Sequence, residues 1–219
     1  MKKTIFGIFV LLFSIPAFAP LEQGQQMISL RGGLGFQLQN SGITYSDTGS
    51  RVNWGSLGGE VGLSYYYLLS EKFGVGADIS IGDFEGGDLT FRMADDVDDE
   101  THLLNLMLTG RYTTNPTKRV RFYFPFGAGL VVARQDLYIN YYGTEYDKKK
   151  TDTSLGFFIG AGMEFDLGNS GWSLGLESRY NTFWYDTDKI LRGAPASIHG
   201  DGNRRYEYLS FNLNVSKRF

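Results

Sequence analysis

The stretch R-Y-E-Y-L-S-F-N-L-N-V-S-K-R-F, residues 205–219, indicates the fold of the whole chain. Apolar side chains recur at every second position, at Phe211, Leu213 and Val215, and Phe219 ends the chain. Polar residues stand between them. A period of two predicts a β-strand with one apolar and one polar face. A strand that runs to a terminal phenylalanine is unusual in a soluble domain, where chain ends commonly fray.

The composition fits one all-β domain. The chain has 219 residues, 29 of them glycine, and 16% are aromatic. Abundant glycine and aromatic residues are typical of a barrel of close-packed strands. The absence of cysteine excludes disulfides and thiolate metal sites.

The first nineteen residues have the pattern of a secretory signal peptide. A positive start at Met1-Lys2-Lys3 precedes an apolar run over 5–13, and Ala17-Phe18-Ala19 is a small-x-small cleavage site. We therefore expect cleavage after Ala19 and a β-barrel domain over 20–219. Without Lys2 and Lys3 the chain has 19 basic against 24 acidic residues, a net charge of −5, which does not favour nucleic-acid binding. No later stretch approaches the ~18 apolar residues of a transmembrane helix.

The same alternation recurs along the chain and predicts eight strands. The connections between them alternate long and short, which an antiparallel up-and-down barrel with both termini at one rim requires. The predicted strands cover about 26–38, 54–67, 73–83, 101–112, 120–133, 153–166, 172–182 and 205–219.

Volume indicates which face points outward. A soluble barrel of lipocalin type would turn its apolar face inward, but an eight-stranded interior is only wide enough to be filled by side chains. One face of the predicted strands is too bulky for that interior, whereas the other is mostly glycine and serine. We therefore expect the apolar face to contact lipid. Its largest side chains are Phe36, Phe73, Phe122, Phe124, Phe126, Phe157, Phe165, Trp172 and Phe211.

Aromatic residues gather where strands meet connections, as expected for rings at the lipid headgroup level. They are Trp54, Tyr65, Tyr67, Tyr112, Phe165, Trp172, Tyr180, Trp184, Tyr206 and Phe219. In the fourth strand we expect the inward face to consist of Leu103, Asn105, Met107, Thr109 and Arg111.

The mature chain resembles the small eight-stranded outer-membrane proteins of the OmpA-transmembrane-domain and OmpX type, the outer membrane protein beta-barrel domain family. The string F-P-F-G-A-G-L at 124–130 is similar to the P-Y-x-G-x-G stretch common in that family. The terminal Phe219 matches as well, whereas Lys217 departs from a position that is often aromatic.

The resemblance implies a location in the cell outer membrane, with four long extracellular loops and three short periplasmic turns. It also implies that the barrel assembly machinery recognises the last strand, through Phe211, Leu213, Val215 and Phe219. Outer-membrane lipid and lipopolysaccharide are then the expected surroundings, and a host or surface ligand of the loops is a possible partner.

Ten charged residues fall on the inward face. Charges in a narrow lumen of low dielectric must be paired or hydrogen-bonded, so we expect an ionic network in layers. Arg111 and Arg121 flank one turn and are expected to be cross-strand neighbours, with carboxylates between them. The alternative to a structural plug is a gated path for protons or small ions. The ten are Arg31, Glu60, Asp78, Arg111, Arg121, Glu164, Asp166, Glu177, Arg179 and Arg218.

Other polar groups give weaker indications. Ser197, His199 and Asp201 could in principle form a catalytic set in the last loop, whereas His102 is expected at the base of a loop. The acidic run 95–100 is expected to be a solvated loop, with a divalent cation that bridges lipopolysaccharide phosphates as the alternative. The lysines at 148–150 could contact lipid phosphates.

These patterns favour a structural or interaction scaffold for envelope integrity, adhesion or host contact, with no catalytic residues, metal or cofactor. Two alternatives stay open. A narrow porin or a conduit for small hydrophobic solutes would need a continuous lumen, and bilayer conductance would reveal it. A lipid A-modifying enzyme would change lipid A, which mass spectrometry would detect.

Overall fold

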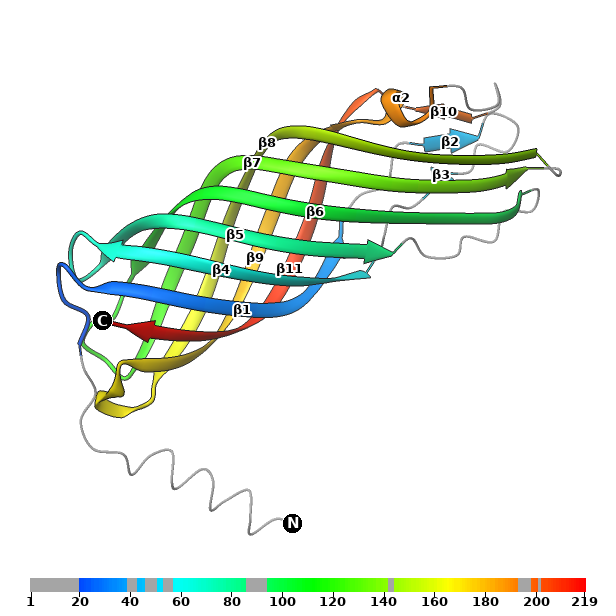
Figure 1. Ribbon diagram of the computed structural model, residues 1–219. Helices are drawn as coiled ribbons and strands as arrows, with labels where there is room; N and C mark the ends of the chain where they lie inside the picture. The colour runs from blue at the N-terminus through cyan, green and yellow to red at the C-terminus, as the bar shows by residue number, and fades with distance from the viewer. Residues whose placement is uncertain are drawn as a thin grey trace, which may run out of the picture.

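The computed structural model describes residues 20–38, 43–45, 51–52, 57–85, 94–141, 144–192, 198–200 and 202–219. Eight strands close into an antiparallel barrel in the order β1-β11-β9-β8-β7-β6-β5-β4 (Figure 1). This confirms the predicted fold. The predicted signal peptide, 1–19, lies outside the described residues. The barrel strands are β1 (Gln26–Gln37), β4 (Leu57–Leu68), β5 (Phe73–Glu85), β6 (Ala94–Thr113), β7 (Val120–Tyr141), β8 (Thr144–Asp166), β9 (Trp172–Asp186) and β11 (Asn203–Arg218).

Closure takes place between the first and last strands. β1 and β11 pair from Met27↔Arg218 to Gln37↔Tyr208. The amide of Phe219 donates to the carbonyl of Gln26 at 2.9 Å, so the pairing continues to the last residue. Closure therefore leaves neither the first nor the last strand of the barrel at a free edge.

Tight connections join the strands at one end, which we call the short-turn end (69–72, 114–119 and 167–171). The turn between β8 and β9 is a single 3-10 turn, η1 (Gly168–Ser170), followed by Gly171 with φ 73°. A Cβ on Gly171 would lie 2.8 Å from the carbonyl oxygen of Arg218, so both the backbone angle and the space require glycine. The chain also ends here (Figure 1).

At the opposite end, the loop end, β6, β7 and β8 continue beyond the other strands (Figure 1). β7 has 22 residues and β8 has 23, whereas about 9–11 suffice to cross a bilayer. The connection predicted across 134–152 is therefore mostly a hairpin, and the acidic run 95–100 is part of β6. We call residues 94–101, 134–141 and 144–152 the strand extension.

Several short elements lie at the loop end (Figure 1). β2 (Ile43–Tyr45), β3 (Arg51–Val52) and β10 (Ile198–Gly200) form a separate three-stranded sheet in the order β10-β2-β3. The helix α2 (Thr187–Ile190) is a single turn. Among the described residues, no helix has the length and apolar character needed to cross a membrane.

The burial of side chains follows the predicted alternation. β4 alternates strictly between exposed and buried positions along its whole length. In β6 Leu103 is 1% exposed and Leu108 is 77% exposed, which confirms the predicted register of that strand. The barrel thus has an apolar outer belt and a filled interior. Tyr206, predicted among the interfacial aromatics, instead lies inside the barrel at 4% exposure.

Candidate functional site

The lumen nearest the short-turn end holds a cluster of five charges, which we call the lower ionic cluster. Glu164 pairs with Arg111 at 2.6 Å and with Arg121 at 2.7 Å. Asp166 binds both terminal nitrogens of Arg121 and pairs with Arg218 at 2.7 Å. All five are buried. Three guanidinium groups therefore share two carboxylates.

Arg111 and Arg121 are not cross-strand partners, so that prediction was wrong. Arg111 lies opposite Pro125, and Arg121 lies opposite Glu164 on β8. The reason is the position of the turn. The amide of Thr114 donates to the carbonyl of Phe122, so the turn is centred later in the chain than the midpoint between Arg111 and Arg121. The carboxylate of Glu164 does lie between the two guanidinium groups.

A second group of charges, the upper ionic cluster, is formed by Arg31, Glu60, Asp78, Glu177 and Arg179. Arg31 pairs with Glu60 at 3.0 Å, and Asp78 accepts from both Arg31 and Arg179, the latter at 3.1 Å. Arg179 also binds Glu177. Two guanidinium groups share three carboxylates here. The excess negative charge of this cluster balances the excess positive charge of the lower one.

Above the charges lies an aromatic layer that the sequence did not predict. Phe183 stacks on Tyr206 with ring centroids 4.8 Å apart, and Phe84 contacts Tyr208 at 5.0 Å. The guanidinium of Arg179 lies 4.4 Å from the centre of the Phe158 ring and joins this layer to the upper ionic cluster. The full layer is Phe84, Leu103, Met107, Val131, Ala133, Phe158, Phe183, Tyr185, Tyr206 and Tyr208.

A sequence signal for this layer existed. Tyr206 and Tyr208 have the same parity as Ser210 and Asn212, so the period of two already places them inside. Phe158 was harder to find, because it stands in an unbroken apolar run between Phe157 and Ile159. The lumen is filled by side chains at three levels.

The outward face just beyond the apolar belt, on β5–β8, is polar. His102 bonds to Asp83 through Nδ1 at 2.6 Å, and its Nε2 lies 3.7 Å from Glu100. Glu100, His102 and Asp136 offer three ligand atoms within 4.8 Å of one another. Arg134 and Lys149, however, already donate to the Asp136 carboxylate.

Asp136 is therefore held in its charged form. Burial alone would raise the pKa of its carboxyl, but hydrogen bonds and positive charge from Arg134 and Lys149 outweigh burial and leave that pKa below its ordinary value. Lys148, another of the predicted lysines, donates to the carbonyl of Arg192.

The other predicted site residues lie apart from the lumen. Phe211, Leu213, Val215 and Phe219 all face outward from the closing strand. His199 lies in β10, whereas 197 and 201, the other two positions of the predicted catalytic set, are outside the described residues.

Comparison with known proteins identifies a matching family. A family described as outer membrane protein beta-barrel domain matches residues 7–219. No curated protein matches the chain. Among solved structures, Neisserial surface protein A is 10% identical, with 90% of this chain and 98% of that chain covered and a TM-score of 0.45.

Two further structures have similar scores. Ail, the attachment invasion locus protein of Yersinia pestis, solved with the heparin analogue sucrose octasulfate, is 12% identical, with 90% and 99% covered and a TM-score of 0.48. The outer membrane protease OmpT from Escherichia coli is 10% identical, with 93% and 99% covered and a TM-score of 0.47.

Proposed function

Because the chain belongs to the outer membrane protein beta-barrel domain family, we propose that it is a closed outer-membrane scaffold that presents its strand extension to the cell exterior. In this proposal a signal peptide is removed after Ala19, the short-turn end lies in the periplasm, and the assembly machinery reads the last strand. The side chains at the end of the chain that face the lipid are available for that recognition. They are Phe211, Leu213, Val215 and Phe219.

The observation that carries the proposal is the filling of the lumen. The lower ionic cluster, the upper ionic cluster and the aromatic layer follow one another along the barrel axis, and their side chains are buried. A conduit for solutes would need all three to rearrange, and breaking a buried ion pair costs about 3–5 kcal/mol. The filled lumen therefore favours a scaffold over a porin.

The strand extension supplies the surface for an interaction. It carries pairing between β7 and β8 as far as Tyr141↔Thr144, well beyond the last β5–β6 pair, Glu85↔Glu100. Its outward face combines acidic and basic side chains, among them Asp136 and Lys149. Such a rigid, polar, projecting sheet suits contact with a surface or with lipopolysaccharide.

A shortened hairpin tests this role. Replacing residues 136–149 with an Asn-Gly turn keeps the Gln135↔Lys150 pair and leaves the barrel intact. Bacteria that display the full chain should adhere to wells coated with fibronectin, collagen or heparin severalfold better than bacteria that display the shortened chain at equal surface level. Equal adhesion of the two strains, or adhesion no higher than that of cells without the protein, would contradict the proposal.

A further inference from the structure

The lipid-facing surface is hollowed on one side of the barrel. A groove of about 870 Å³ crosses β7, β8, β9, β11 and β1. Its floor is formed where small side chains replace large ones, at Gly32, Ala161 and Ser178. Ala161 and Ser178 are direct cross-strand partners, and Ser178 is the partner of Phe211. The larger outward residues around it are Leu34, Phe36, Phe122, Met163, Leu176, Phe211 and Leu213.

Barrel packing does not require the hollow at Gly32. A Cβ built there would meet no atom closer than 3.9 Å, whereas a Cβ on its neighbour Gly33 would lie 1.9 Å from the carbonyl oxygen of Phe211. Gly33 is thus required by the close approach of two strands, but Gly32 leaves space that a larger outward side chain would fill.

Two cations lie below this groove, toward the short-turn end. Lys217 stands on the lipid-facing side of β11, with its ammonium 5.4 Å from the centre of the Trp172 ring and 5.8 Å from that of Phe219. Three strands away, the guanidinium of Arg119 lies 4.4 Å from the centre of the Phe165 ring. The groove spans the strands from β11, which carries Lys217, to β7, which Arg119 directly precedes.

The distance between the groove and Lys217 matches the length of one lipid molecule. Lys217 is four residues from Leu213 at the groove, which at ~3.3 Å per residue is about 13 Å along the strand. Lysine at the interface places its ammonium among the headgroups while its methylenes stay in apolar surroundings. Basic groups at that level attract lipid phosphates.

We propose that this groove binds one acyl chain of an anionic phospholipid, whose phosphate is held by Lys217 and Arg119. With the short-turn end in the periplasm, as proposed above, the lipid belongs to the periplasmic leaflet. In this site Lys217, which departs from the family's aromatic pattern, would hold a phosphate in addition to the carbonyl of Ser170, to which its ammonium donates.

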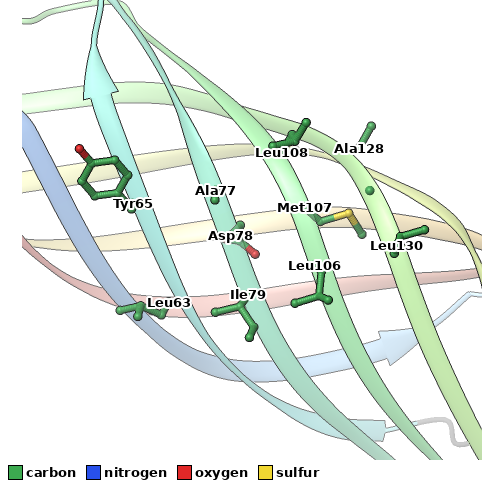
Figure 2. Close-up of a pocket in the computed structure, with 11 residues that line it drawn as sticks. Leu63, Tyr65, Ala77, Asp78, Ile79, Leu106, Met107, Leu108, Ala128 and Leu130 are labelled. Atoms are coloured by element: carbon green, nitrogen blue, oxygen red, sulfur yellow. The ribbon is translucent and has the colours of Figure 1, made fainter.

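A second hollow provides a matched control. It lies across β4–β7, has a volume of about 540 Å³, and is lined by residues that include Ala77, Leu108 and Ala128 (Figure 2). Leu108 stands between the two alanines, which are its partners on β5 and β7. The outward pair of this hollow nearer the short turns is Phe73↔Tyr112.

Native mass spectrometry of the folded protein in detergent, titrated with phosphatidylglycerol, tests the proposal. The wild type should bind one lipid at low concentration. Filling the groove with Ala161→Leu and Ser178→Leu, or removing the charge with Lys217→Gln, should weaken binding at least fivefold. The control Ala77→Leu with Ala128→Leu should bind phosphatidylglycerol as the wild type does. Lys217→Gln and the wild type should bind uncharged diacylglycerol equally.

Equal affinity of all variants for phosphatidylglycerol would overturn the proposal, as would an equal loss in the control. A dimer that the groove-filling variant abolishes would overturn it too, because the occupant would then be a second copy of the chain. Heat-dependent gel mobility verifies that each variant is folded. Binding in micelles does not depend on membrane orientation or on adhesion, so this inference and the proposed function can fail separately.

Discussion

At the scale of single residues, Glu164 and Asp166 are the two carboxylates that hold the lower ionic cluster together. Each receives two guanidinium groups, and Arg121 contacts both. A carboxylate and a guanidinium removed from water are stabilised only by such partners, so removal of one partner leaves an uncompensated buried charge.

We expect Glu164→Gln combined with Asp166→Asn to destabilise the barrel by at least about 3–5 kcal/mol, the usual result of breaking a buried pair. Urea unfolding in detergent, followed by tryptophan fluorescence, measures the change. Asp152→Asn is the matched control, because Asp152 pairs with Lys189 at 3.3 Å near the surface, where a pair contributes about 0–1 kcal/mol. An unchanged unfolding midpoint for the double variant would contradict a stabilising role for the cluster.

The face on which each charge lies could be predicted from the sequence, but its partners could not. Parity alone places Arg218 and Asp166 in the lumen. Their contact joins β11 to the end of β8, strands that do not pair with each other. Such a contact depends on the stagger of the strands around the barrel, and no local pattern encodes that stagger.

At the scale of elements, the strand extension could not be predicted from the apolar periodicity of the sequence. Inside the membrane an apolar face alternates with a polar one. Beyond the belt the outward side chains of β7 become charged, as at Arg134 and Asp136. The inward face stays buried, as at Leu137. The contrast between an apolar outer face and a polar inner face therefore disappears although the strands continue. The hairpin therefore resembles a loop in the sequence.

The extension should respond to acid. The pKa of Asp136 is lower in the folded protein than in the unfolded chain, so its stabilising contribution is present above the ordinary value near pH 4 and is lost as the pH falls through the lowered value. We expect the effect to be small, up to about 1 kcal/mol, because the pairs are near the surface.

Hydrogen-exchange protection factors for amides of the extension, corrected for intrinsic rates, measure this effect. Protection in the wild type should fall between pH 6 and pH 3 toward that of Asp136→Asn. The variant should change less over the same range, since it already lacks the charge. Parallel pH profiles for the two proteins would contradict a contribution from Asp136.

At the scale of the whole molecule, the barrel and its lipid-facing side could be predicted from the sequence, because the same alternation recurs in eight segments. Of the aromatic layer, parity places Tyr206 and Tyr208 inside, but the space for its rings could not be predicted. An eight-stranded lumen is narrow, yet Phe84 and Phe158 are buried in it. Glycines on neighbouring strands make the room: a Cβ on Gly58 would lie 2.5 Å from the Phe84 ring, and one on Gly127 would lie 2.4 Å from Phe158.

Glycines and rings thus form complementary pairs across strands, visible only once the register is known. Together with the two ionic clusters they fill the lumen along its length. A closed lumen distinguishes a scaffold that works through its outer surface from a conduit.

Conductance across a planar lipid bilayer measures whether the lumen is closed. After insertion of the folded protein, we expect no stepwise current above that of the protein-free bilayer. Reproducible single-channel steps that require the folded protein, and that change when the aromatic layer is altered by Tyr208→Ala, would contradict a closed lumen.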